Sequence, residues 1–394
     1  MSLFSKNESY LGVDIGAHGI KLVELKKTKN RSQLWTYGIA EQTLDIHLPE
    51  VKDKTPEELI SDGKTTPFDN GMGEDAPKKK KKNDELPELS DPRINKYAKL
   101  LKELAREANV STKLATASLP VSYVFHTVLN LPVVEDKKLE KVVRAEVEKF
   151  LPKPIDEMQI VHQKIPDKIN PENPKEKKQN MSVLVTAAPK VLIQFYSNIF
   201  SKAGLQLQEL ETEAFALERS LVGIDRSTAM IVDIGSERTN FFIIDQGLPL
   251  VHRSISQGGM MINKIIAKEL SVEMDIAEQI KKDLSNLKPG SDVLDTEIFK
   301  PILDSILKEI KYSFDMFLSQ SGNEDKRPEK IIFTGGTSLL PFFVSEAKKQ
   351  FNMRAFVGDP WARVVYQQGL KQVLDDIAPR MSVSIGLAMR NIIK

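Results

Sequence analysis

Two stretches of the chain place an aspartate and a glycine in a tight turn between apolar runs. Residues 11–25 read LGVDIGAHGIKLVEL, and residues 230–244 read MIVDIGSERTNFFII. Glycine lets the backbone come close to a phosphate, and the amides of a turn attract an anion. An aspartate cannot hold a phosphate, but it can fix water around a Mg²⁺ that bridges phosphate oxygens. The repeat predicts two turns that hold a polyphosphate between them, with Asp14 and Asp233 on the magnesium through water.

A third stretch adds a paired glycine. Residues 333–338 read FTGGTS, and a purine ring could lie against Gly335 and Gly336. Each of the three pieces occurs alone in many ordinary turns and loops. Their order and spacing set them apart from such turns: Asp14-x-Gly16 with Lys21, then Asp233-x-Gly235 with Thr239, then the glycine pair about a hundred residues on.

Turns of this kind are held in place by the strands that flank them, which must belong to β-sheets. Apolar runs predict three consecutive strands at 10–16, 19–28 and 33–42, a helix at 95–109 and a strand at 115–120. The three-strand pattern restarts from residue 227 and is followed by helices through 259–320 and a strand that enters the glycine pair. We therefore expect a duplicated α/β fold with halves at 1–120 and 227–380, a connecting helix at 207–226, and a C-terminal helix at 381–394 that packs on the first half.

The pattern of apolar residues changes over residues 121–206. Residues 121–206 predict strands at 122–132, 157–166 and 181–189, with helices at 137–151 and 190–204. This pattern favours a small α+β subdomain inserted into the first half.

Composition narrows the class of protein. The 394 residues suit two or three domains. The formal net charge is +1, so no broad basic field points to nucleic acid as a partner. Without cysteine there are no disulfides or thiolate metal sites. No stretch reaches the roughly 18 apolar residues of a spanning helix, so we expect a cytoplasmic protein.

Two polar segments interrupt the pattern. Residues 47–90 are rich in Pro, Gly, Asp and Lys and contain KKKKK at 78–82, which predicts a disordered insertion. The lysine run could contact acidic lipid or nucleic acid, but a solvated linker explains it more simply. Residues 168–180 predict a long hairpin loop.

The three motifs together resemble the actin-like ATPase superfamily, whose two phosphate loops and adenosine loop come in this order. More narrowly, the place of the α+β module, the run LNLPVVEDKKLEKVVRAEVEKFLPKPIDEM at 129–158, LETEAFALERSL at 210–221 and MSVSIGLAMR at 381–390 are similar to the PilM family of type IV pilus proteins, which is related to the division protein FtsA. The resemblance implies a duplicated ribonuclease H-like fold that binds ATP with Mg²⁺.

The resemblance also implies roles for single residues. The first loop would contribute backbone amides of Gly16, Ala17 and His18 and the ammonium of Lys21, and the second loop would face the phosphates with Gly235, Ser236 and Thr239. The nucleoside would contact Glu278, Lys281 or Lys282 on a helix, and the loop of Gly335, Gly336 and Thr337. The family usually has Ser or Thr where Ala17 and His18 stand, so His18 either replaces that ligand or is an exposed turn residue. The Glu278 and lysine set is also compatible with an ordinary charge pair on a helix surface.

Glu213 is the one candidate for a role in hydrolysis. It matches a glutamate that positions the attacking water in related filament proteins. A glutamate at a helix start is also a plain capping feature, and that interpretation is the simpler one. The sequence therefore predicts ATP binding with slow or no hydrolysis.

Three functions remain open. The first is an ATP-binding scaffold of a type IV pilus or type II secretion inner-membrane platform. The resemblance implies that the cytoplasmic N-terminal peptide of a PilN-like single-span membrane protein binds in a groove of this chain. The walls of the groove would come from residues 122–131 and 137–150, and the bound peptide would bring the chain to the inner membrane. Pilus assembly ATPases and self-association are further expected contacts. The second function is an FtsA-like division protein, which the absence of a terminal amphipathic helix after LAMRNIIK disfavours. The third is a small-molecule kinase, for which no aspartate base stands in a matching context.

Overall fold

The computed structural model describes residues 8–28, 31–47, 91–165, 180–285, 296–320, 323–324 and 326–392. The predictions for 47–90 and 168–180 fall almost wholly outside these residues. Among the described helices, none combines the length and the apolar character that crossing a bilayer requires.

The first half is built on a mixed sheet in the order β14-β3-β2-β1-β4-β8. Its strands are β1 (Ser9–Gly16), β2 (Gly19–Thr28), β3 (Arg31–Ala40), β4 (Leu114–Leu119), β8 (Gln206–Thr212) and the two-residue β14 (Val364–Val365). The first three strands are antiparallel neighbours, whereas β4 lies parallel to β1 and β8 lies parallel to β4.

The second half repeats this arrangement. Its sheet has the order β11-β10-β9-β12-β13, formed by β9 (Ala229–Ile234), β10 (Thr239–Asp245), β11 (Leu248–Ile255), β12 (Lys330–Thr334) and β13 (Arg354–Val357). Strands β12 and β13 run parallel to β9, as β4 and β8 run parallel to β1. The matching order of the two sheets confirms the predicted duplication.

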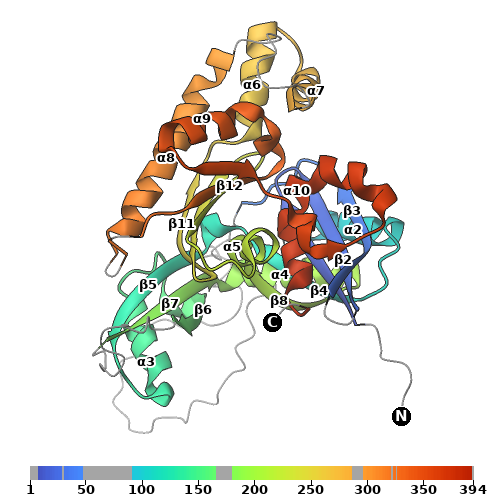
Figure 1. Ribbon diagram of the computed structural model, residues 1–394. Coiled ribbons are helices and arrows are strands. Elements are labelled where there is room, and N and C mark those ends of the chain that lie inside the picture. Colours follow the sequence, from blue (N-terminus) through green and yellow to red (C-terminus); the bar gives the residue numbers. More distant parts are fainter. Residues whose placement is uncertain are drawn as a thin grey trace, which may run out of the picture.

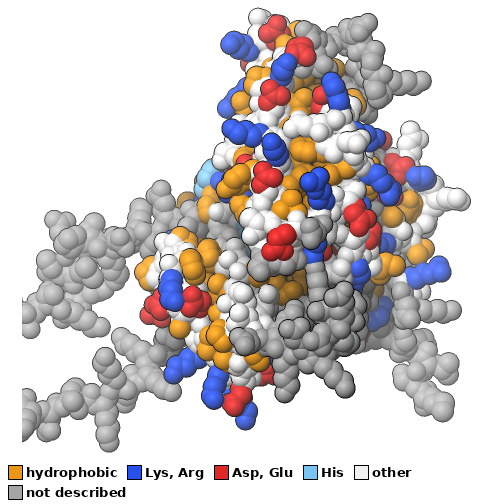
Figure 2. All heavy atoms as spheres, turned by 60° about the vertical axis from the view of Figure 1, so that its left-hand side comes forward, with side chains coloured by type: hydrophobic (Ala, Val, Ile, Leu, Met, Phe, Trp, Pro, Cys, Tyr) orange, Lys and Arg blue, Asp and Glu red, His pale blue; other side chains and the backbone are white. Residues whose placement is uncertain are grey.

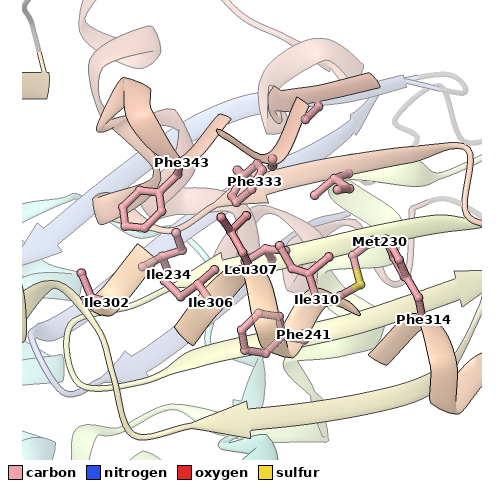
Figure 3. Close-up of a cluster of buried hydrophobic side chains, with 14 of the residues drawn as sticks. Met230, Ile234, Phe241, Ile302, Ile306, Leu307, Ile310, Phe314, Phe333 and Phe343 are labelled. Carbon is pink, nitrogen blue, oxygen red and sulfur yellow. The ribbon is translucent and has the colours of Figure 1, made fainter. Parts of the chain in front are cut away.

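Helices cover both sheets (Figure 1). The second half carries α6 (Gly259–Leu270), α7 (Met274–Ser285), α8 (Lys300–Leu318) and α9 (Pro341–Phe351). In Figure 3, Ile302, Ile306 and Ile310 come from one face of α8 and pack toward Phe241 and Phe333 of the sheet. Their spacing of four residues is the repeat that places apolar side chains on one side of a helix.

The inserted subdomain is smaller than the sequence suggested. A separate three-stranded sheet, β5-β7-β6, consists of β5 (Phe125–Pro132), β6 (Met158–Lys164) and β7 (Asn180–Pro189), with α3 (Asp136–Val147) against it. The helix α4 (Lys190–Ala203) packs instead with α2 (Pro92–Glu107) in the core of the first half. The predicted range 121–206 is therefore too long, because the apolar face of α4 is buried against α2 and not against the subdomain.

Two histidines join the subdomain to the second half. The ring of His126 on β5 lies 5.0 Å from that of His252 on β11. Their Nε2 atoms lie 2.8 Å from the carbonyl oxygen of Pro249 and 3.2 Å from that of Val121, respectively. Burial lowers the pKa of His126 to about 4 and that of His252 to about 3, so both imidazoles are neutral at pH 7.

The C-terminal helix α10 (Lys371–Met389) begins ten residues before the predicted boundary at 381. It packs on β1 and β2 and also lies between the halves. A Cβ on Gly12 of β1 would lie 2.1 Å from the carbonyl oxygen of Ser384, and one on Gly386 would lie 1.9 Å from that of Ala216. Both glycines are therefore required for α10 to approach β1 and the short helix α5 (Glu213–Leu217) this closely.

Charged side chains are mixed on the surface. On the face shown in Figure 2, basic and acidic side chains are interspersed among apolar ones. This arrangement agrees with the nearly equal counts of 56 basic and 55 acidic residues.

Candidate functional site

The predicted site residues meet in one cavity between the two halves. The cavity has a volume of about 400 Å³. It is lined by every candidate except Thr239: Asp14, Gly16, Ala17, His18, Lys21, Glu213, Asp233, Gly235, Ser236, Glu278, Lys281, Lys282, Gly335, Gly336 and Thr337.

The first loop is the two-residue turn between β1 and β2. Gly16 pairs with Gly19 across the turn, which leaves Ala17 and His18 at its tip. Behind the tip, the ammonium of Lys21 lies 3.4 Å from one carboxylate oxygen of Asp14, and the hydroxyl of Ser118 donates to the other at 3.1 Å. Lys21 on β2 and Ser118 on β4 thus hold the Asp14 carboxylate in place beside the turn.

The second loop is joined to the start of α6. The amide of Gly235 donates to the carbonyl oxygen of Arg238 at 2.9 Å inside the turn. The carbonyl oxygens of Gly235 and Ser236 accept from the amides of Gly259 and Met260 at 2.9 and 2.8 Å. The loop is therefore rigidly placed opposite the first one.

Thr239 does not face the cavity, contrary to the sequence prediction. Its side chain is fully buried and its hydroxyl donates to the carbonyl oxygen of Gln257 at 2.7 Å. Side chains alternate along a strand, so the next residue, Asn240, lines the cavity instead. Its amide donates to the carboxylate of Glu213 at 3.2 Å.

The third loop crosses the end of β9. Gly335 has φ +83°, and a Cβ there would lie 2.5 Å from the carbonyl oxygen of Ile234 and 2.6 Å from a carboxylate oxygen of Asp233. Only glycine fits this conformation and this space. The loop therefore lies directly against Asp233 at the end of β9.

The carboxyl groups of Asp14, Glu213 and Asp233 interact with one another inside the cavity. Burial, reinforced by the Asp14 carboxylate, raises the pKa of Asp233 from 3.8 to about 6. Burial raises the pKa of Glu213 well above its ordinary range, with further contributions from Asp233 and Asp14. Lys21 opposes both shifts. A bound divalent cation would relieve this repulsion.

The raised pKa of Asp233 predicts how stability depends on pH. The folded state holds the proton of Asp233 more tightly than the unfolded chain does. Protonation of Asp233 therefore adds its full contribution to the free energy of unfolding below pH 4, and this contribution is lost as the pH rises through about 6. The change from 3.8 to about 6 corresponds to roughly 3 kcal/mol. We expect Asp233→Asn to remove this loss, so that its free energy of unfolding exceeds that of the wild type most at pH 7 to 8. Denaturant unfolding of both proteins between pH 4 and pH 8 measures it, and parallel pH curves would contradict the assignment.

Helix α7 brings a chain of charges to the cavity. His18 Nε2 lies 3.2 Å from a carboxylate oxygen of Glu278, and Lys282 Nζ lies 3.7 Å from the same oxygen. Lys281 points to the start of α6, with its Nζ 3.4 Å from the carbonyl oxygen of Gly259, and burial lowers its pKa. His18 is therefore paired across the cleft and is not a free turn residue.

Several cavity residues were not predicted. Arg238 donates to the hydroxyl of Tyr123 at 3.3 Å, next to the entry into the inserted subdomain. Arg380 of α10 pairs with Glu41, and both line the cavity. The position of Arg238, three residues after Gly235, was a usable sequence signal, whereas nothing local marks Arg380 or Glu41.

Direct metal coordination has little support from the side chains. Within the described ranges, no three His, Cys, Asp or Glu side chains converge as a metal-binding group. Asp14 and Asp233 instead fit a cation that they hold through water and whose direct ligands are water and phosphate, as Mg²⁺ prefers.

The duplicated sheets, the inserted subdomain and the two facing turns define the class of protein: an actin-like ATPase fold. The family model "Type IV pilus assembly protein PilM" matches residues 72–392. The chain therefore belongs to the PilM family of type IV pilus assembly proteins.

Two individual proteins are similar to the chain in fold or in sequence. A solved PilM-PilN type IV pilus biogenesis complex contains a chain that is 22% identical, with a TM-score of 0.72, over 97% of this chain and 98% of that one. The cell division protein FtsA of Pseudomonas aeruginosa is 25% identical over 211 residues, so the match spans 48% of each protein. The structural likeness supports the predicted fold over nearly the whole chain.

Proposed function

We propose that this chain is an ATP-binding scaffold of the type IV pilus inner-membrane platform. Nucleotide binding is supported by one observation: two Asp-x-Gly turns face each other across one cavity, with Lys21 and the glycine loop of Gly335 beside them. Lys21 supplies a cation to phosphate oxygens, and Asp14 and Asp233 would hold Mg²⁺ through water. The bound metal would neutralise phosphate charge beside the carboxyl groups of Asp14, Glu213 and Asp233.

The state of Glu213 favours slow or absent hydrolysis. Burial raises the pKa of its carboxyl group well above the ordinary range, and a carboxyl group that retains its proton is a poor general base. Its oxygen also accepts from Asn240, which holds it in place. We therefore assign Glu213 a positioning role for water and assign the nucleotide a mainly structural role.

The membrane partner we propose is a PilN-like single-span protein. In the solved PilM-PilN complex a relative of this chain is bound to PilN. The groove would lie beside the inserted subdomain, with β5 and α3 as walls, and a bound N-terminal peptide would bring the chain to the inner membrane. Contacts with pilus assembly ATPases and self-association belong to the same proposal.

Nucleotide binding should appear as a stabilisation that depends on Lys21. At a hundredfold excess over Kd, a ligand adds ~2.7 kcal/mol to the free energy of unfolding, so ATP with Mg²⁺ should raise the melting temperature, and EDTA should reduce the effect. Lys21→Met should shrink the shift at equal ATP, because the ammonium beside the phosphates is lost. Lys102→Met, on the exposed side of α2, is the matched control. An unchanged melting temperature of folded wild-type protein at millimolar ATP and Mg²⁺ would refute nucleotide binding.

A further inference from the structure

Helix α10 forms one wall of the nucleotide cavity. Its residues Asp376, Pro379, Arg380, Ser382 and Val383 line the cavity. A Cβ built on Gly336 would lie 3.2 Å from Cγ, 3.5 Å from Cδ and 3.9 Å from Nε of Arg380. The arginine side chain therefore already covers the glycine surface on which the sequence placed a purine ring.

The backbone holds this arginine next to the glycine loop. The carbonyl oxygen of Pro379 accepts from the amide of Gly335 at 3.0 Å and from the hydroxyl of Thr334 at 3.1 Å. The hydroxyl of Ser382 lies 2.7 Å from that of Thr334. These contacts join α10 to the loop on both sides of Arg380, so the side chain starts from a fixed point.

The guanidinium is also held at its far end. It pairs with Glu41, which follows β3 of the first half, and Lys282 Nζ lies 3.8 Å from the other oxygen of Glu41. The side chain of Arg380 is 22% exposed. The pKa of the Glu41 carboxyl is lowered, since Arg380 and Lys282 together outweigh the opposing effect of burial. Glu41 is thus charged and fixes the orientation of the guanidinium across the cleft.

We propose that Arg380 is the residue on which the base of the bound nucleotide stacks, and that Glu41 positions its guanidinium for this contact. The inference rests on the nucleotide binding proposed above. A planar guanidinium offers a flat, weakly hydrated surface that stacks on aromatic rings, which a lysine ammonium does not. Stacking contacts the face of the base and not its edges, so ATP and GTP should depend on Arg380 alike.

The test compares nucleotides with inorganic tripolyphosphate, which has no base. Titration calorimetry with Mg²⁺ would measure ATP, GTP and tripolyphosphate on the full chain for the wild type, Arg380→Lys, Arg380→Met and Glu41→Gln. We expect both Arg380 variants to bind ATP and GTP about tenfold more weakly, a loss of ~1.4 kcal/mol, with tripolyphosphate affinity changed less than twofold. Glu41→Gln should show the same pattern at about threefold. Arg354→Lys, on an exposed position of β13, is the matched control and should change nothing.

The outcomes separate the two proposals. Equal losses for ATP and tripolyphosphate would mean that Arg380 acts on the phosphates or on the fold, and unchanged ATP affinity would mean that it does not contact the base. Either result overturns the inference while leaving nucleotide binding intact. Failure of the wild type to bind any of the three ligands overturns both. Melting temperatures of all variants identify any that are merely unfolded.

Discussion

Replacing Gly335 with alanine should abolish nucleotide binding and strongly destabilise the protein. This residue has φ +83° and ψ 155°, a region that is essentially restricted to glycine. The added Cβ would also lie 2.6 Å from the Asp233 carboxylate and 2.5 Å from a backbone oxygen. Backbone strain and collision together should lower the free energy of unfolding by about 3 kcal/mol or more.

Gly204 provides the matched control for this change. It ends α4 with φ +80°, and a Cβ there would meet nothing within 4 Å. Gly204→Ala should therefore cost only about 1 kcal/mol, the ordinary penalty of a left-handed alanine, and leave ATP affinity unchanged. Denaturant unfolding and nucleotide titration of both variants measure the difference. Similar losses of stability in the two proteins would contradict the tight contact between the glycine loop and Asp233.

The second large effect is expected at Glu211. This buried carboxylate at the end of β8 pairs with Arg219 and lies 2.6 Å from Nη1 of Arg390, just after α10. Arg219 also donates to the carbonyl oxygen of Gly386 at 2.9 Å. Glu211→Ala leaves the buried Arg219 without its carboxylate, whereas Arg390 keeps its ion pair with Glu209. Breaking a buried ion pair such as that of Glu211 and Arg219 costs about 3–5 kcal/mol.

Removing the Glu211 carboxylate should also weaken the proposed nucleotide site, because it loosens the end of α10 and α10 also carries Arg380. We expect Glu211→Ala to lower the melting temperature and to weaken ATP binding, both measured on the full chain. The surface pair of Glu146, at the end of α3, with Lys149, just after the helix, is the control, and Glu146→Ala should cost less than about 0.5 kcal/mol. If the two variants have equal stability, the network does not anchor α10.

The parts of the site that could be predicted are those in which the functional residues lie at the end of one strand and in the turn that directly follows it. Asp14 and Gly16 end the strand β1, and Asp233 lies near the end of β9 with Gly235 just after it, so local pattern and position in the fold coincide. The error at Thr239 arose within such a turn, because it required the side-chain register of β10, which the sequence does not show until the first paired residue is known.

The rest depends on contacts between distant segments. The pairs of His18 with Glu278 and of Arg380 with Glu41 join residues 260 and 339 positions apart. No local motif encodes such a pair, since its formation depends on how the two halves pack. The assignment of α4 failed for the same reason, because its amphipathic pattern fits a partner in the subdomain as well as it fits α2.

We propose above all that this protein holds the N-terminal peptide of a PilN-like membrane protein. Phe125 and Ala187 are paired across β5 and β7, so residues 125–187 can be replaced by a short linker while α4 stays in its core. Fluorescence anisotropy would then follow the labelled peptide from the adjacently encoded PilN-like protein, titrated with the full chain and with the deletion variant. Our account predicts saturable binding to the full chain near micromolar Kd, roughly −8 kcal/mol, and none to a folded, nucleotide-binding deletion variant or with a scrambled peptide. Equal binding by the deletion variant, or no binding by the intact chain, would contradict it.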